Sequence, residues 1–296
     1  MSTLIKLNIP RFTSPFETNV SKFEDVVHQA VRKWWTQMGI VTNKEEVDHL
    51  INIDSVGISC RSIPDATLEE QFVFASTIFM TEAISKGEKI EPKDALEKAG
   101  MDVQEDALRY YKNQMPLLRR NLNYFFRSNQ WEMKVNRRHR IPTLGEYCAI
   151  RNTTISFYLI IDMFEPLGGI ELPIEFRGRT PIRELYDATL KINWTMNDIL
   201  SLSKELKDNC SANLVIVLKN ELQCDWQTAV EEAYKMHEEA VQEFLIAEKL
   251  LVETGDQNID NILAKYVQFL KNVLSSQYYF YNNTDRYGNY TIIEVQ

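Results

Sequence analysis

The segment NDILSLSKEL, residues 197–206, places three oxygen-bearing side chains four residues apart. Asn197, Ser201 and Glu205 offer an amide oxygen, a hydroxyl and a carboxylate. On an α-helix each step of four residues exceeds a full turn by ~40°, so these side chains form one slowly drifting row that rises ~12 Å. Mg²⁺ binds hard oxygen ligands of this kind. The spacing therefore fits half of a magnesium site, although solvated helix faces often carry the same residues at the same interval.

Cationic side chains at three other places in the sequence are candidates for binding an anion beside such a metal. Arg151 stands in the apolar stretch EYCAIRNTTISFYLII, where a buried charge needs a partner. Lys204 directly precedes Glu205, and Arg286-Tyr287 follows the last expected helix. Three cationic groups and a metal suit a diphosphate, because the cations clamp its oxygens and the metal bridges it to the protein.

The composition of the chain narrows the classes of protein that these residues can serve. With 296 residues, of which 44% are hydrophobic, the chain can bury the core of one large domain. Its 10 Gly and 9 Pro are few for this length, which favours long helices over a loop-rich β architecture. The net charge of −9 argues against nucleic acid as a partner. A phosphorylated substrate can still bind where cations locally reverse the sign of the potential.

The location of the protein is predicted from features that the sequence lacks. No apolar run approaches the ~18 residues of a membrane span, and the N-terminus has no secretory signal. We therefore expect a cytoplasmic protein without a membrane partner. The four cysteines show no CxxC spacing and are expected to be reduced thiols, and the four histidines are dispersed, so no His-based metal motif is present.

Helical periodicity dominates the elements that must position these residues. The pattern predicts helices over 22–38, 67–86, 104–128, 143–165, 181–207, 211–222, 226–253 and 258–281. In the first of these, one face is expected to be buried and comprises Phe23, Val26, Val27, Ala30, Val31 and Trp34. Thr143 and Glu146 have the spacing of a capping box. The tail TIIEVQ alone resembles a strand, and no other segment is expected to pair with it. We therefore predict a single all-α domain over 1–296, with a short N-terminal extension at 1–20.

The sequence resembles the class I terpene synthases, the microbial-type single-domain cyclases, from about residue 60 to 290. NDILSLSKE matches the second metal motif of this family, N-D-x-x-S-x-x-K-E, at every defined position. The resemblance implies a helical bundle that encloses an apolar cavity. It also implies that Asn197, Ser201 and Glu205 bind Mg²⁺, with Mn²⁺ as an alternative metal, and that Lys204 contacts the diphosphate of the substrate.

Two further positions match the family in the same order along the chain. Arg151 resembles its pyrophosphate sensor and stands at the expected interval before the metal motif. Thr154 and Ile155 then occupy the linker and effector positions, and a break after Thr154 is expected in the otherwise continuous helix over 143–165. Arg286-Tyr287 resembles the C-terminal Arg-Tyr pair that caps the closed site of the family.

The family's aspartate-rich motif, D-D-x-x-D or a relative, is not found where the resemblance places it. The helix that should end in this motif reads ATLEEQFVFASTIF, and it is followed by MTEAISKG. Thr81, Glu82 and Ser85 stand in the place of the acidic ligands, and only Glu82 is a carboxylate. The interval from this helix to the sensor arginine is also short for the family. Either the motif has degenerated to Glu82 alone, or a segment that carries it is missing between Phe79 and Met80.

The resemblance implies Mg²⁺-dependent ionisation and cyclisation of a prenyl diphosphate with release of diphosphate. Farnesyl diphosphate is the commonest substrate of the family, and the protein is expected to be a monomer or a homodimer. Two alternatives remain: a catalytically impaired relative or non-enzymatic helical scaffold, and a chain-elongating enzyme of the same fold. The second of these uses two aspartate-rich motifs, which NDILSLSKE does not match.

Two other features of the sequence have no assigned role. Aromatic residues at helical spacing are candidates for lining a carbocation pocket, although such residues more often belong to the core. They are Phe72, Phe74, Phe79, Phe157, Tyr158 and Trp194. The basic stretch KVNRRHRIP, residues 134–142, is expected to be a solvated loop or to steer an anionic substrate.

Overall fold

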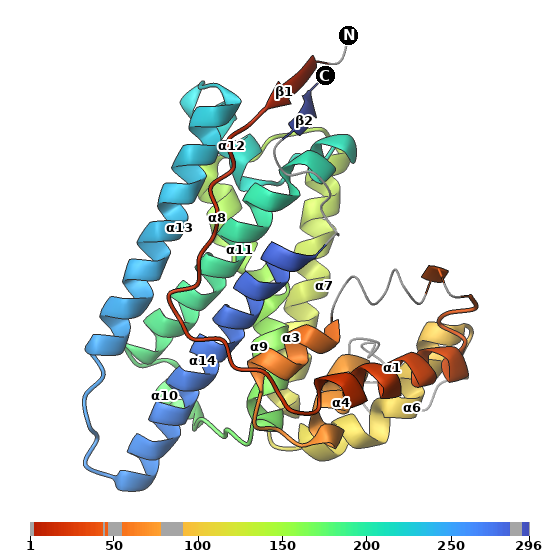
Figure 1. Ribbon diagram of the computed structural model, residues 1–296. Helices are drawn as coiled ribbons and strands as arrows, with labels where there is room; N and C mark the ends of the chain where they lie inside the picture. The colour runs from red at the N-terminus through yellow and green to blue at the C-terminus, as the bar shows by residue number, and fades with distance from the viewer. Residues whose placement is uncertain (1–2, 44, 47–54, 78–90, 285–291, 296) are drawn as a thin grey trace.

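The computed structural model describes residues 3–43, 45–46, 55–77, 91–284 and 292–295. These residues form a helical bundle with one pair of short strands (Figure 1). The helices are α1 (Glu24–Met38), α3 (Ser55–Ser62), α4 (Leu68–Thr77), α6 (Ala95–Tyr110), α7 (Met115–Arg137), α8 (Leu144–Thr154), α9 (Phe157–Leu167), α10 (Ile174–Arg177), α11 (Ile182–Lys207), α12 (Leu214–Leu222), α13 (Trp226–Lys249) and α14 (Gln257–Asn283). The prediction of an all-α fold is confirmed.

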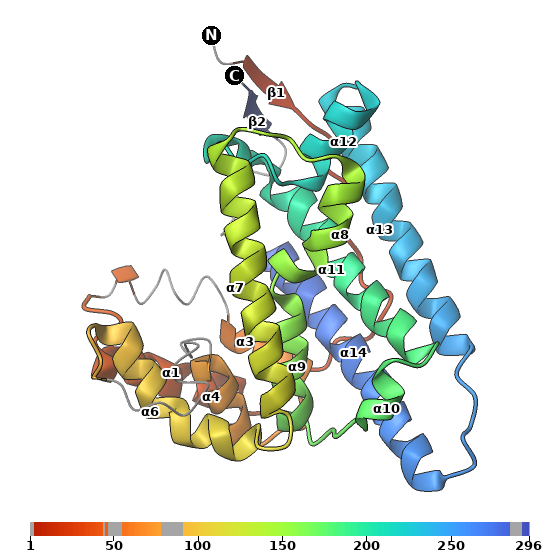
Figure 2. The same cartoon turned by 180° about the vertical axis from the view of Figure 1, so that it is seen from behind.

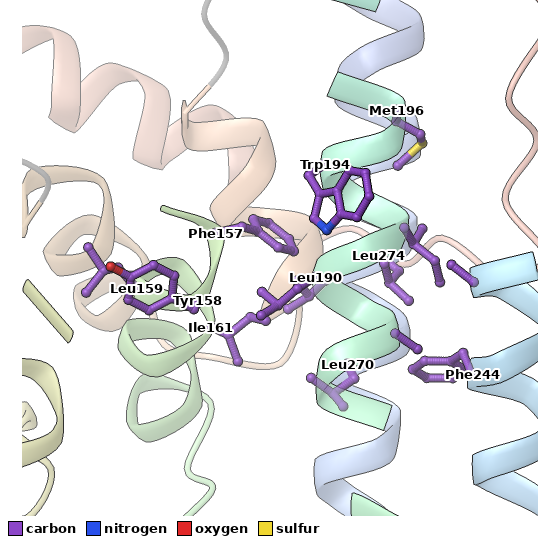
Figure 3. Close-up of a cluster of buried hydrophobic side chains, with 14 of the residues drawn as sticks. Phe157, Tyr158, Leu159, Ile161, Leu190, Trp194, Met196, Phe244, Leu270 and Leu274 are labelled. Carbon is purple, nitrogen blue, oxygen red and sulfur yellow. The ribbon is translucent and has the colours of Figure 1, made fainter. Parts of the chain in front are cut away.

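Helix α11 runs through the middle of the main bundle and packs against α13 and α14. It follows Pro181 and contains neither Gly nor Pro up to Lys207, which agrees with the predicted helix over 181–207. Figure 3 shows apolar side chains of α9, α11 and α14 meeting in the core of this bundle, among them Ile161, Leu190 and Leu274. The helix that carries the metal motif is therefore held on several sides.

A second, smaller core lies beside the main bundle and is formed by α1, α3, α4 and α6 (Figure 1). Val27, Val31 and Trp34 of α1 are buried in it, as predicted. Val26 was expected on the same face but is 47% exposed, because the buried stripe turns toward Trp35 instead.

Two of the predicted helices are each interrupted. The helix expected over 104–128 is divided into α6 and α7, because the chain turns at residues 111–114 and Pro116 occupies the first turn of α7. The helix expected over 143–165 begins with the predicted capping box of Thr143 and Glu146. It is then interrupted at Ser156, whose φ of 60° lies in the left-handed region. The break separates α8 from α9 just after Thr154.

The prediction that the C-terminal strand has no partner is wrong. Strand β2 (Ile292–Val295) pairs antiparallel with β1 (Thr3–Lys6), and Thr3 faces Val295 in the ladder. Periodicity could not show this, because the two segments lie at opposite ends of the sequence. After β1 the chain follows the bundle and buries Phe12, whose ring centroid lies 4.8 Å from that of His237 on α13. The segment expected to be a short extension is therefore packed on the bundle.

His237 is buried beneath this N-terminal segment, and its burial makes the stability of the fold depend on pH. Its ring nitrogens lie 3.0 Å from the Thr195 hydroxyl and 2.9 Å from the Tyr278 hydroxyl. Burial lowers the pKa of His237 from 6.5 to about 4. The unfolded chain therefore binds a proton at a higher pH than the folded chain, so stability is lost as the pH falls from 6.5 toward 4.

The loss expected from His237 is at most about 3 kcal/mol in the free energy of unfolding. Urea unfolding followed from about pH 7 to about pH 4.5 measures it. A His237→Asn variant should show a smaller pH dependence than the parent. The exposed His139 provides a matched control, and His139→Asn should keep the pH dependence of the parent. Equal slopes for the parent and His237→Asn would contradict the prediction.

Candidate active site

The three predicted metal ligands form one row on α11, and their side chains are turned away from bulk solvent. Ser201 is 2% exposed, and its hydroxyl donates to one oxygen of Glu205 at 2.8 Å. The other oxygen of Glu205 accepts from the side-chain amide of Asn213 at 2.8 Å. The amide of Asn197 donates to the Tyr281 hydroxyl at 3.1 Å. Asn197 and Glu205 are half-buried, so the row lines the inside of the bundle.

Arg151 reaches this row from the last turn of α8. Its side chain is 8% exposed, and one terminal nitrogen donates to Asn197 at 2.8 Å and to Asp198 at 2.5 Å. The other terminal nitrogen donates to the Thr154 hydroxyl at 3.3 Å. Burial alone would lower the pKa of Arg151, but Asp198 and the other acidic groups around it together outweigh burial and raise that pKa, so the guanidinium stays charged. Sequence reasoning placed Arg151 beside the metal motif, and the structure brings the two together.

Asp198 connects three elements around the site, although sequence reasoning gave it no role. It is fully buried and binds the guanidinium of Arg151. It also accepts hydrogen bonds from the Tyr147 hydroxyl and from the backbone N–H of Leu214 at 3.0 Å. Its position in the motif, directly after Asn197, was the available signal. On a helix that spacing turns Asp198 away from the metal row and toward α8 and α12.

Glu132 on α7 is a second acidic residue that the sequence analysis missed. Burial raises the pKa of its carboxyl group, whereas Arg151 and a hydrogen bond from Thr154 act to lower it. Glu132 is the one acidic residue in the sequence between Arg119 and Arg140, and this isolation among basic residues was the available signal for a functional carboxylate. Its carboxyl group therefore approaches Arg151 from the α7 wall.

The carboxyl groups around Arg151 outnumber the cationic side chains that face them. Burial, together with the nearby Asp198, raises the pKa of Glu205 to about 7, although Arg151 partly offsets the effect. One guanidinium thus faces three carboxyl groups, those of Asp198, Glu205 and Glu132. An anionic ligand binds in such a site only with additional cations.

The remaining predicted site residues lie further from this cluster or outside the described part of the chain. Lys204 is 47% exposed in its side chain and pairs with Asp208 at 2.9 Å. Glu82, Arg286 and Tyr287 lie outside the described residues. Their roles remain predictions.

The candidate aromatic residues are mostly part of the two cores. Phe157, Tyr158 and Trp194 are buried in the main core (Figure 3). The indole N–H of Trp194 donates to Asn152 at 2.9 Å. Phe72 packs edge-on against Trp34 in the small core. The side chains of Phe74 and Phe79 lie outside the described part of the structure.

A groove of about 640 Å³ opens between α7, α9, α10 and α11. Asp162 lines it and is hydrogen-bonded by the Asn121 amide, and burial raises the pKa of Asp162 to about 7. The lining of this groove includes none of Arg151, Asn197, Ser201 or Glu205, so the apolar cavity predicted beside them remains a prediction.

A helical bundle with a buried arginine against an N-D-x-x-S-x-x-K-E row defines a class of protein, and comparison with protein families gives the same class. Residues 63–243 match the model of terpene synthase family 2, C-terminal metal binding. The chain belongs to this family and is a class I terpene synthase of the microbial type, an enzyme of the terpene cyclase class. The resemblance stated from the sequence is confirmed.

Individual relatives support this assignment. A (+)-T-muurolol synthase of Roseiflexus castenholzii, which cyclises (2E,6E)-farnesyl diphosphate, is 28% identical over 88% of both chains. A (+)-eremophilene synthase of Sorangium cellulosum is 24% identical over 84% of both. The crystal structure of germacradien-4-ol synthase from Streptomyces citricolor matches the fold with a TM-score of 0.78, at 16% identity and over 93% of this chain and 99% of that one.

These alignments also reveal a difference in length. The alignment with the muurolol synthase runs over 290 residues, yet it takes in 88% of this chain, and 88% of 296 residues is about 260. About 30 residues of the alignment therefore have no counterpart here. The eremophilene synthase gives the same difference, because 84% of 296 is about 249 and that alignment runs over 279.

No helix among the described residues is both long enough and apolar enough to cross a membrane.

Proposed function

We propose that this terpene synthase acts on a prenyl diphosphate, farnesyl diphosphate in particular, and that the α8–α11 site binds its diphosphate together with Mg²⁺. The hydrogen bond between Arg151 and Asn197 carries the proposal, because it joins the anion-binding cation to the metal row. The muurolol synthase of Roseiflexus castenholzii cyclises farnesyl diphosphate, which favours that substrate here.

The donor set of the row fits Mg²⁺. Asn197, Ser201 and Glu205 provide three oxygen ligands, and no group of three His, Cys, Asp or Glu residues in the described chain could hold a metal. The metal would therefore use the amide and hydroxyl oxygens as well as the carboxylate, with Mn²⁺ as an alternative. A bound divalent cation supplies Lewis-acid activation of the diphosphate leaving group and also offsets the surplus of carboxyl groups.

The protein's own side chains have complementary tasks in this proposal. Arg151 donates hydrogen bonds to the diphosphate oxygens and stabilises the negative charge that develops there. Asp198 positions Arg151, and Glu132 holds Thr154 at the end of α8. On the resemblance, Lys204 and the Arg286-Tyr287 pair add further contacts to the diphosphate. The apolar bundle keeps water from the carbocation.

We infer that this particular chain turns over slowly. The two alignments have about 30 positions without a residue of this chain, which favours a missing segment over stepwise loss of the aspartate-rich motif. We assign that segment to the position between Phe79 and Met80, where the resemblance expects the motif. A catalytically impaired protein that still binds diphosphate is therefore the second candidate function.

The first test measures binding rather than turnover, so it does not depend on the missing segment. Inorganic diphosphate titrated calorimetrically into the protein with Mg²⁺ should bind, and it should bind far more weakly without the metal. Arg151→Gln should weaken binding by about tenfold or more, because a charge-assisted hydrogen bond contributes about 1.5–3 kcal/mol.

Arg183→Gln provides the matched control for this test. Arg183 is 70% exposed and pairs with the exposed Asp187 one turn further along α11, and neither residue contacts Arg151. Its loss removes the same charge and should leave the affinity for diphosphate unchanged. Equal effects of the two substitutions would contradict a specific role of Arg151.

A further inference from the structure

Helix α7 concentrates positive charge in a protein whose net charge is −9. From Met115 to Arg138 the chain carries six basic residues and one acidic residue, Glu132. Five of the basic residues are exposed, and we call them the basic stripe: Arg120, Arg127, Lys134, Arg137 and Arg138. Four of them fall within about 40° of one another on the helix surface, because they follow at intervals of seven, seven and four residues. These four are Arg120, Arg127, Lys134 and Arg138.

The residues of the basic stripe form no ion pair within the described part of the chain, although Arg120 acts on the buried Asp162 at longer range. None of its five residues has a carboxylate within 4.0 Å there, and Arg120 donates only a 3.4 Å bond to Asn121. Exposed cations elsewhere do form ion pairs, among them Arg109, Arg140 and Arg183. The chain contains 42 acidic residues, so the stripe lacks ion-pair partners because of where the acidic residues lie and not because they are few.

Large apolar side chains flank the stripe on the same helix. Tyr124 is 49% exposed, Phe126 38% and Met133 50%. The groove of about 640 Å³ opens beside them, and Tyr124 and the 70% exposed Ile174 both line it. Basic residues combined with exposed aromatic and aliphatic side chains are typical of helices that lie in a membrane interface.

The opposite flank of the molecule carries the opposite charge. Helix α13 has six glutamates and two lysines, and both views place α13 and α7 on different sides of the main bundle (Figure 2). A surface of negative potential therefore attracts the α7 flank and repels the α13 flank. This separation orients the protein despite its negative net charge.

We propose that α7 docks this protein on the surface of an anionic lipid bilayer. A helix places four of the five cations, Arg120, Arg127, Lys134 and Arg138, against a flat surface at once, over a length of ~27 Å. Tyr124, Phe126 and Met133 favour lipid over nucleic acid, because they gain by entering the boundary between headgroups and acyl chains. The sequence-based expectation of no membrane partner rested on the lack of a spanning segment, which surface docking does not need.

The binding of α7 to a bilayer does not depend on the proposed function. The benefit of this binding to the enzyme does rest on the proposed function. A prenyl diphosphate is an amphiphile, and a cyclised hydrocarbon dissolves in acyl chains and not in water. An enzyme held at the bilayer surface receives the first and releases the second without crossing bulk solvent.

The experiment is flotation of the purified full chain with vesicles. Binding is expected to phosphatidylcholine vesicles that contain phosphatidylserine, and not to phosphatidylcholine alone. It should weaken with added salt, which screens exposed charges. Each cation removed should lower the affinity about fivefold, equivalent to about 1 kcal/mol near an anionic leaflet. The triple variant R127Q/K134Q/R138Q should therefore bind about 100-fold more weakly.

A matched triple variant controls for the change in net charge. Arg32, Lys33 and Lys235 are exposed on α1 and α13, and R32Q/K33Q/K235Q should bind vesicles as the parent does. Both triple variants should keep the far-UV circular dichroism of the parent and its affinity for Mg²⁺-diphosphate. The latter measurement separates failure of the docking from failure of the proposed function.

Three results would overturn the proposal. The first is equal vesicle binding by the two triple variants, or no binding to anionic vesicles at low salt. The second is stripe-dependent binding of an oligonucleotide that is tighter than binding to vesicles, which would assign α7 to nucleic acid. The third is a dimer in light scattering that the stripe variant abolishes in the absence of vesicle binding, which would make α7 an interface between two copies.

Discussion

Inserting the missing segment should convert a slow enzyme into an efficient one. We expect the 296-residue chain to release diphosphate from farnesyl diphosphate and Mg²⁺ two to three orders of magnitude more slowly than a version with an aspartate-rich segment of about 30 residues before Met80. The reason is that the unmodified chain has few side chains that can bind the metal cations. The diphosphate needs several cations as its charge grows, and the proposed function assigns one ligand set for them, Asn197, Ser201 and Glu205.

The size of this effect follows from known costs of lost transition-state stabilisation. Removal of one group that stabilises developing charge costs about 2.7–4 kcal/mol, or about 100-fold to 1,000-fold in rate. The measurement is product formation by mass spectrometry with ten-, fifteen- and twenty-carbon prenyl diphosphates. The inserted segment with its aspartates replaced by asparagine is the matched control and should restore little activity.

Efficient cyclisation by the unmodified chain would contradict this prediction. Glu82→Gln then identifies the source of the activity, because Glu82 is the one carboxylate left in MTEAISKG. A large loss of rate in that variant would mean that Glu82 has replaced the motif.

Asp198→Ala should destabilise the folded protein by about 3–5 kcal/mol. Asp198 is fully buried, and its removal leaves the guanidinium of Arg151 without its ion-pair partner in the interior. The same change removes the acceptor for Tyr147 and for the backbone N–H of Leu214. Urea unfolding followed by circular dichroism measures the loss through the midpoint at an unchanged slope.

A double-mutant cycle separates the ion pair from general damage to the core. Arg151→Ala and Asp198→Ala together should cost less than the sum of the two single changes, with a coupling of about 1–3 kcal/mol. Simple additivity would mean that the two residues do not stabilise each other. Asp208→Ala serves as the comparison, because its pairing with the 47% exposed Lys204 should contribute at most about 1 kcal/mol.

Local patterns were enough to predict the elements that carry the site. Helix α11 follows a proline and runs without a breaker to Lys207, so the alignment of Asn197, Ser201 and Glu205 in one row followed from spacing. That this row faces inward followed from the family resemblance. The capping box of Thr143 fixed the start of α8 in the same way. The turn at 111–114 was missed because Pro116 is compatible with both the interior of a kinked helix and the first turn of a new one.

Contacts between distant elements could not be read from periodicity. Glu132, Arg151 and Asp198 come from three different helices, and nothing in the pattern of any one helix indicates that they meet. The pairing of β1 with β2 joins segments from the two ends of the sequence. Such contacts depend on how whole helices pack, which a single sequence specifies only through the complete fold.

The division of the hydrophobic interior into two cores bears on how this sequence tolerates a large deletion. The small core uses residues of α1, α3 and α6, with Leu68 and Phe72 of α4 packed against it. The fully buried residues of the main core include none from α1 or α6, although Leu108 and Tyr110 of α6 pack against it. The helices that carry the proposed site, α8 and α11, contribute to the main core and not to the small one. We therefore expect a chain that is shortened near the small core to keep the packing of α8 and α11, so that the ability to fold can outlast the ability to catalyse.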